Sequence, residues 1–266
     1  MSLLKQMQQE LLQLEEHSNL RHLPKMTHDG REVIVNNKRM LNLSSNDYLG
    51  LASDRALREE FLRTLTPDTF LPSSSSSRLL TGNFTVYEEL EAELSHLFGT
   101  EAALVFNSGY HANTGILPAV SDAHTLILAD KLVHASLIDG IRLSAAKCIR
   151  YRHNGLTQLE RLLEEHHTTH HRVIIVTESI FSMDGDQADL QKLTELKRKY
   201  DNVLLYVDEA HAFGVRGRQG LGCAEEFHCI HDIDFLVGTF GKAAASVGAY
   251  IVCKKVIRAV SYTHLT

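Results

Sequence analysis

Polar and small residues follow four apolar segments of this sequence, each where a β-strand is expected to end. The four groups are NSGYH (107–111), ESIFSMDGD (178–186), DEAH (208–211) and GTFGKA (238–243). They combine an amine, several carboxylates, imidazoles and glycine-containing turns. Side chains of these types suit either nucleotide binding or covalent chemistry through a lysine.

A nucleotide-binding interpretation fails on the spacing of its glycines. An apolar strand that ends in Asp-Glu-Ala-His also occurs in helicase metal-binding motifs, and Gly241-Lys242 could belong to a phosphate-binding loop. That loop requires G-x-x-x-x-G-K-[ST], but Leu236 stands at the first glycine position and Ala243 follows the lysine. We therefore expect no ATPase activity of this type.

The same groups meet the requirements of pyridoxal phosphate. This cofactor needs a lysine for a Schiff base, a carboxylate for its pyridine nitrogen and an anion site for its phosphate. Lys242 and Asp208 provide the first two, and a helix that begins near Gly109 would provide free amides for the third. Residues 107–111 could also form an ordinary capped turn, so this part of the site depends on the other two.

The elements that position these groups alternate between strand and helix from residue 84 onward. Expected strands cover 102–106, 125–128, 147–151, 172–177, 203–207, 235–237 and 249–252, and expected helices cover 87–98, 135–144, 157–166 and 190–200, with a further helix from about 110. Near-continuous apolar strands between helices predict an α/β fold with a mainly parallel sheet covered by helices on both faces. The carboxyl ends of such strands form the ligand-binding edge.

The N-terminal part has a different pattern. Residues 1–18 have helical apolar spacing, residues 32–35 and 39–43 read as a hairpin about Asn36-Asn37, and residues 54–65 are helical. We expect a segment 1–45 followed by a large cofactor-binding domain 46–266. Five consecutive serines, 73–77, are interpreted either as a flexible linker or as a backbone that curls around an anion.

Composition places the chain among ordinary globular proteins. The 266 residues include 27 Lys+Arg against 33 Asp+Glu, a net charge of −6, which argues against a nucleic-acid partner. No apolar run approaches the roughly 18 residues of a membrane span, and the N-terminus lacks a secretory pattern. Four cysteines without a C-x-x-C pair suit a reducing compartment. The expected location is the cytoplasm.

Six motifs resemble the α-oxoamine synthases, pyridoxal-phosphate enzymes of the type I aminotransferase fold. They are SSNDYLGL (44–51), SRLLTGN (77–83), HASLIDG (134–140), FSMDGD (181–186), VDEAHAFGVRGRQGLG (207–222) and GTFGKA (238–243), in the family's order. Within the family, the first motif and Asn19-Leu20-Arg21 are most similar to the subfamily that forms 8-amino-7-oxononanoate in biotin biosynthesis.

The resemblance implies a role for each matching residue. Lys242 would form the Schiff base, Asp208 would pair with the pyridine nitrogen, and His134 would stack on the cofactor and meet the substrate; these three are the expected catalytic residues. The remaining expected contacts are His211 to the phenolic oxygen, the backbone amides of Gly109 and Tyr110 and the hydroxyl of Thr239 to the phosphate, Ser182 to the cofactor pocket, and Arg21 and Asn46 to substrate.

The activity implied by the resemblance is a decarboxylative condensation of L-alanine with pimeloyl-CoA or a pimeloyl carrier protein, in a homodimer. Glycine C-acetyltransferase, another α-oxoamine synthase such as serine palmitoyltransferase, and a non-catalytic partner subunit remain alternatives. No metal is expected, because the histidines at 166, 167, 170 and 171 fall between a helix and a strand and read as a solvated loop.

Two features depart from the family pattern. The loop before SRLLTGN is usually rich in glycine, whereas here it is rich in serine, which lacks glycine's freedom at positive φ. The family also continues into a smaller C-terminal domain, so the chain is expected to be truncated, and residues 261–266 match nothing in the family pattern.

Overall fold

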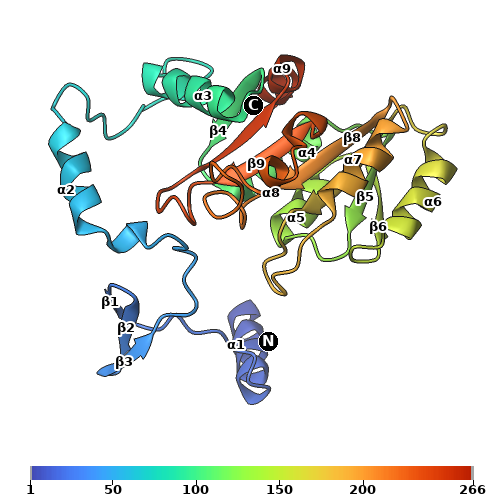
Figure 1. Cartoon of the computed structure of the whole chain (residues 1–266). Helices are drawn as coiled ribbons and strands as arrows, with labels where there is room; N and C mark the ends of the chain where they lie inside the picture. Colours follow the sequence, from blue (N-terminus) through green and yellow to red (C-terminus); the bar gives the residue numbers. More distant parts are fainter. Residues whose placement is uncertain (1, 265–266) are drawn as a thin grey trace. The chain divides into compact units, whose positions relative to one another are not determined.

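The computed structural model describes residues 2–264 and divides into two compact units, with the boundary between Ser45 and Asn46 (Figure 1). The first unit contains α1 (Leu3–Glu16) and a three-stranded antiparallel sheet of β1 (Thr27–Asp29), β2 (Glu32–Val35) and β3 (Lys38–Leu41). Asn36 and Asn37 have φ of 49° and 62°, the left-handed pair that a tight hairpin turn requires. Strand β1 escaped prediction because its three residues are polar and exposed.

The second unit is built on a seven-stranded sheet with the order β4-β10-β9-β8-β7-β5-β6. Its strands are β4 (Ala102–Phe106), β5 (Thr125–Asp130), β6 (Lys147–Tyr151), β7 (Arg172–Glu178), β8 (Val203–Asp208), β9 (Phe235–Thr239) and β10 (Ala249–Cys253). The pairs among β5, β6, β7, β8 and β9 are parallel, and β10 runs antiparallel to both of its neighbours. The expected mainly parallel α/β fold is confirmed.

Burial along the strands shows that both faces of the sheet are covered. Residues Val173 to Glu178 of β7 are all buried, although successive side chains of a strand point to opposite faces. The covering helices are α3 (Thr85–Phe98), which precedes β4, and four helices that connect successive strands: α4 (Gly109–Ala119), α5 (Ala135–Leu143), α6 (Leu156–His166) and α7 (Leu190–Arg198) (Figure 1).

Several further elements complete the second unit. They are η1 (Leu51–Ser53), α2 (Arg55–Thr64), α8 (Cys223–Glu226), η2 (Ile230–Asp232) and α9 (Lys255–His264). Helices α8 and α9 were not expected from the sequence. Within residues 2–264, no helix has both the length and the apolar character needed to cross a membrane.

The serine run forms a loop with hydrogen bonds of its own. The Ser73 hydroxyl accepts the Ser75 amide at 3.0 Å, and Ser75 has φ of 51°. Gly82 lies so close to this loop that a Cβ there would be 2.1 Å from the Ser76 carbonyl oxygen. Glycine is therefore required at the point where SRLLTGN closes against the serines.

Register between neighbouring strands determines where the polar strand ends meet. Glu178 at the end of β7 pairs with Asp208 at the end of β8, and Asp208 pairs with Val237 of β9. Because these strands are parallel and in register, their terminal side chains and the loops that follow lie along one edge of the sheet.

Candidate functional site

A cavity of about 180 Å³ lies at the carboxyl ends of β7, β8 and β9. The N-terminal turns of α4 and α5 complete its wall. The lining residues are Gly109, Tyr110, Asn113, His134, Ser136, Glu178, Asp208, Ala210, His211, Thr239 and Lys242. The structure thus brings together seven of the ten site residues expected from the sequence.

Lys242 presents its amine to the imidazole of His211, with Nζ 2.7 Å from Nε2. Burial lowers the pKa of Lys242, although the acidic side chains of Asp208 and, when it is ionised, Glu178 oppose that shift. Burial and the nearby Lys242 charge lower the pKa of His211 to about 4. A neutral imidazole beside a lysine of lowered pKa is an arrangement in which the amine can act as nucleophile and base.

Asp208 is held by two hydrogen bonds that fix its carboxylate. Asn113 Nδ2 donates to Oδ2 and the Ala210 amide donates to Oδ1, both at 2.9 Å. The Tyr206 hydroxyl donates to Asn113 Oδ1 at 2.7 Å, which orients the amide. Asn113 escaped sequence reasoning because it lies inside a helix, where it carries no motif; the structure shows it as the residue that aims Asp208.

Glu178 is a second carboxyl group of the cavity to which sequence reasoning gave no role. Its side chain is buried beside Asp208 and accepts the backbone amide of His134. Burial and the neighbouring Asp208 charge raise the pKa of Glu178 to about 8. The available signal was its position after the apolar strand 172–177, directly before the FSMDGD region.

His134 both caps α5 and lines the cavity. Its Nδ1 accepts the Ser136 amide at 3.2 Å and lies 2.8 Å from the Ser136 hydroxyl. Capping α5 is compatible with a role in the cavity, because the cap uses only one of the two ring nitrogens.

The expected phosphate contacts surround the start of α4. Ser108 caps the helix by accepting the His111 amide at 3.2 Å, and Gly109 is the first helical residue. A Cβ on Gly109 would come no closer than 4.0 Å to Thr239, so no neighbouring side chain crowds this residue. The Thr239 hydroxyl already donates to the Gly248 carbonyl at 3.0 Å and accepts the Gly241 amide at 3.1 Å.

Three expected site residues do not line this cavity. Ser182 lies in an exposed turn between Ile180 and Gln187, which form an isolated antiparallel bridge. Asn46 is exposed, and its Oδ1 accepts the Tyr48 hydroxyl at 3.3 Å. Arg21 is exposed within the first unit. The roles given to these three residues stay predictions.

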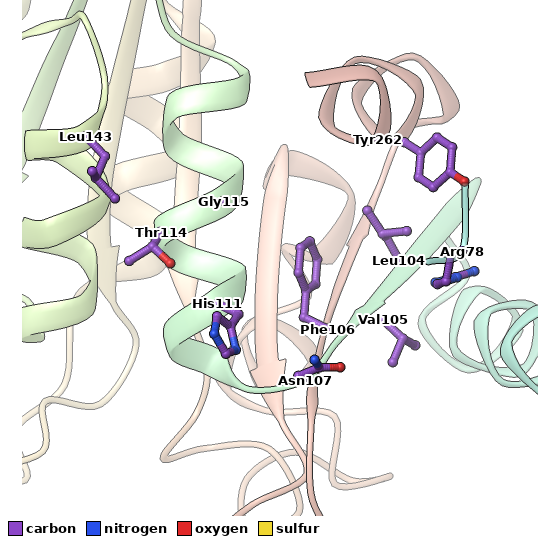
Figure 2. Close-up of a pocket in the computed structure, with 10 residues that line it drawn as sticks. All are labelled: Arg78, Leu104, Val105, Phe106, Asn107, His111, Thr114, Gly115, Leu143 and Tyr262. Carbon is purple, nitrogen blue, oxygen red and sulfur yellow. The ribbon is translucent and has the colours of Figure 1, made fainter. Parts of the chain in front are cut away.

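A larger cavity of about 410 Å³ opens elsewhere, between β4, the start of α4 and α9. Figure 2 shows its largely aliphatic and aromatic wall, with Leu104, Val105 and Phe106 along β4. Among the described residues, those that line it include no lysine and no acid. Size alone therefore does not identify a reactive site, and the smaller cavity is the one lined by Lys242, Asp208 and His211.

No metal centre is evident in the part of the chain that the structure describes. Within residues 2–264, no three His, Cys, Asp or Glu side chains are arranged to hold an ion. In the histidine cluster, the Nδ1 atoms of His167 and His170 contact the carbonyls of Leu163 and His166 at 2.9 and 3.2 Å.

Comparison with known proteins assigns the family. The profile described as "Aminotransferase class I and II" matches residues 38–263. The chain belongs to this family. A curated relative named 8-amino-7-oxononanoate synthase, from Haemophilus ducreyi, is 59% identical over 244 residues, which are 90% of this chain and 63% of the relative.

Two solved structures extend the comparison to the fold. A variant of serine palmitoyltransferase from S. paucimobilis, with a bound pyridoxal phosphate–myriocin aldimine, has a TM-score of 0.86 and 28% identity, covering 98% of this chain and 67% of its own. The 8-amino-7-oxononanoate synthase from Francisella tularensis has a TM-score of 0.69 and 31% identity, covering 83% and 60%. The resemblance seen in the motifs is confirmed.

The chain spans only part of its relatives' length. It covers 66%, 65% and 63% of three curated relatives, from Glaesserella parasuis, Pasteurella multocida and Haemophilus ducreyi.

Proposed function

We propose that this chain carries the cofactor site of an enzyme that condenses L-alanine with a pimeloyl thioester, with loss of CO2, to give 8-amino-7-oxononanoate. The observation that carries the proposal is the Lys242 amine, 2.7 Å from His211 in a cavity that also holds Asp208. The curated relative of that name, at 59% identity, supports the choice of substrates within the family.

The residues of the cavity fit pyridoxal phosphate by the chemistry of their donors. Lys242 offers an amine for the aldehyde, the oriented carboxylate of Asp208 suits the pyridine nitrogen, and the start of α4 suits the phosphate. When bound, the cofactor supplies an electron sink that stabilises negative charge on the α-carbon of the amino acid.

The protein's own groups then hold and move protons. Lys242 removes the α-proton of alanine and later returns a proton, a task that suits a lysine whose pKa burial has lowered. Asp208 keeps a proton on the pyridine nitrogen, and Asn113 holds Asp208 in place. The new bond joins the α-carbon to the acyl carbon, CoA or carrier-protein thiol leaves, and the alanine carboxylate departs as CO2.

Product analysis of the full-length protein tests this proposal. Alanine or glycine would be offered with pimeloyl-CoA, a pimeloyl carrier protein or acetyl-CoA, and products identified by mass spectrometry. We expect 8-amino-7-oxononanoate from alanine and a pimeloyl thioester, and none from Lys242→Ala. Preferred turnover of glycine with acetyl-CoA would instead indicate glycine C-acetyltransferase. Absence of turnover with every pair would favour a non-catalytic partner subunit.

We also propose that the full-length protein is a homodimer in the cytoplasm. Helix α2 has no buried residue and exposes Leu57, Phe61 and Leu62, an apolar surface suited to a second subunit. The four cysteines are free thiols, three of them buried, as suits a reducing compartment.

A further inference from the structure

A chain of hydrogen bonds runs from the SSNDYLGL motif to the amine of Lys242. The Tyr48 hydroxyl lies 2.7 Å from His211 Nδ1, and His211 Nε2 lies 2.7 Å from Lys242 Nζ. On its other side, the Tyr48 hydroxyl donates to Asn46 Oδ1 at 3.3 Å. The imidazole of His211 is therefore held between a phenol and an amine.

The protons of this chain can be assigned from what each atom is able to do. The side-chain oxygen Oδ1 of Asn46 can only accept a hydrogen bond, and it accepts the hydroxyl hydrogen of Tyr48. The Tyr48 oxygen is then the acceptor in its contact with His211, and the donor is Nδ1–H of His211. Burial and Lys242 hold the pKa of His211 near 4, so its ring carries a single proton at neutral pH. That proton is on Nδ1, and Nε2 presents a lone pair to Lys242.

The segment that carries Tyr48 is held in place by its own backbone. The Tyr48 amide donates to the Asn46 carbonyl at 2.9 Å, and the Ala52 amide donates to the Asp47 carboxylate at 3.2 Å. Gly50 has φ of 71°, a conformation that favours glycine. This folded turn fixes the phenol although Tyr48 is 41% exposed.

Other polar side chains face His211 without replacing Tyr48. Lys242, Asp208 and His134 all act on it electrostatically. The Asp208 carboxylate already accepts Asn113 and Ala210, and His134 Nδ1 caps α5. Tyr48 is the partner that hydrogen-bonds to Nδ1 of His211.

We propose that Tyr48 is a positioning residue for Lys242, because it fixes His211 in the Nδ1-protonated tautomer and so aims a lone pair at the amine. The proposal rests on the proposed function in that Lys242 is the reacting group. The sequence predicts that Asn46 contacts substrate. In this proposal its side-chain oxygen instead accepts the hydrogen bond that the Tyr48 hydroxyl donates.

The test reads the tautomer directly by NMR. The protein is labelled with 15N-histidine and recorded without cofactor at neutral pH, and the His211 signals are assigned by their loss in His211→Gln. We expect a protonated, pyrrole-type Nδ1 and a pyridine-type Nε2 in the wild type. Tyr48→Phe should shift the ring toward the Nε2-protonated form, because Nδ1 then has no acceptor.

Two further variants complete the design. Tyr110→Phe removes another cavity hydroxyl, which donates to Asp139 rather than to His211, and should leave the tautomer unchanged. Asn46→Ala frees the Tyr48 proton to point at Nδ1 and should give a mixture of tautomers, which keeps the proposal testable if Tyr48→Phe does not fold.

Either of two results would overturn the inference: a wild-type ring protonated on Nε2, or a tautomer that stays the same in every folded Tyr48 and Asn46 variant. Product analysis of the full-length protein separates this outcome from failure of the proposed function. A wild type with the expected tautomer but no synthase activity would contradict the function and leave the role of Tyr48 in aiming Lys242 intact.

Discussion

At the scale of single residues, Lys242 differs from an ordinary surface lysine in its neighbours. Burial lowers its pKa, and its nitrogen contacts an imidazole that is neutral at physiological pH. A surface lysine such as Lys192 instead pairs with Glu195 and stays solvated. Reactivity toward an aldehyde should therefore concentrate at Lys242.

Lys242→Ala should abolish the covalent adduct that borohydride traps between the protein and pyridoxal phosphate. The physical reason is that the variant removes the amine that faces the cavity, at the edge where the strands end. Mass spectrometry of peptides locates the adduct. Lys192→Ala, the matched exposed control, should trap as much cofactor as the wild type; an adduct on another lysine in the wild type would contradict the assignment.

Asp208→Asn should leave the cofactor bound but slow α-proton exchange of alanine by about 100-fold, the usual cost of removing one preorganised electrostatic group. A neutral amide cannot hold the pyridine nitrogen protonated. Loss of the α-deuterium from labelled alanine, followed by NMR in full-length protein, measures the rate. Asp201→Asn removes an exposed acid and should change nothing, whereas near-normal exchange in Asp208→Asn would require another proton holder.

At the scale of elements, β7 and β8 place the carboxyl groups of Glu178 and Asp208 side by side, but the two groups have different hydrogen-bond partners. Asp208 accepts two hydrogen bonds from Asn113 and Ala210. Glu178 accepts one, from His134, and burial raises its pKa to about 8. The cavity edge therefore holds one oriented carboxylate and one group that stays protonated near neutral pH.

Glu178 should make the folded chain less stable as the pH rises. Its pKa is raised from 4.5 to about 8, so between these values the folded protein holds a proton that the unfolded chain has released. The free energy of unfolding then falls as pH increases across that window. Urea denaturation at pH 5.5 and 8 should show a smaller fall in Glu178→Gln, which keeps an oxygen for the His134 amide.

The exposed variant Glu164→Gln on α6 serves as control and should follow the wild-type pH dependence. If Glu178→Gln and wild type lose stability in parallel between the two pH values, Glu178 is not the group that is protonated in the folded state.

Helices α4 and α5 pack closely at Gly140, where a Cβ would be 2.3 Å from the Asn113 carbonyl oxygen. Gly140→Ala should therefore destabilise the fold by about 1–3 kcal/mol, as overpacking does. It should also displace Asn113, which aims Asp208. Gly109→Ala, with 4.0 Å of room, should leave stability unchanged or slightly higher. Urea midpoints compare the two, and an unaffected Gly140→Ala would mean that the helices separate without cost.

At the scale of the whole molecule, exposed apolar side chains gather on α2. Replacing Phe61 and Leu62 together by serine should weaken self-association of the full-length protein, because serine transfers much less apolar surface from water into the interface. Light scattering after size-exclusion chromatography over a range of concentrations measures the mass. Val256→Ser removes a similarly exposed side chain from α9 and should keep the wild-type mass. A dimer unaffected by both changes would place the interface elsewhere.

Strand prediction succeeded where a strand carries aliphatic or aromatic residues and failed where it carries none. Ala102–Phe106 and Lys147–Tyr151 have the expected bounds, and β9 extends two residues beyond the expected Val237, to Thr239. Polar strand ends such as Thr239 remain in the ladder because register with a neighbour, not apolar character, keeps them extended. The polar strand β1 carried no apolar signal at all.

The sequence by itself determined the fold class and the family, and it predicted the amine, carboxylate and imidazole that the structure places in one cavity, because apolar periodicity and motif chemistry are local properties of the chain. Only the tertiary structure decided which groups act on one another. Strand register places Glu178 beside Asp208, and helix packing positions Asn113 to donate a hydrogen bond to Asp208. The fold also brings the Tyr48 hydroxyl into contact with His211. Such contacts join residues far apart in the chain, and burial changes their pKa values only once the fold has excluded water from them.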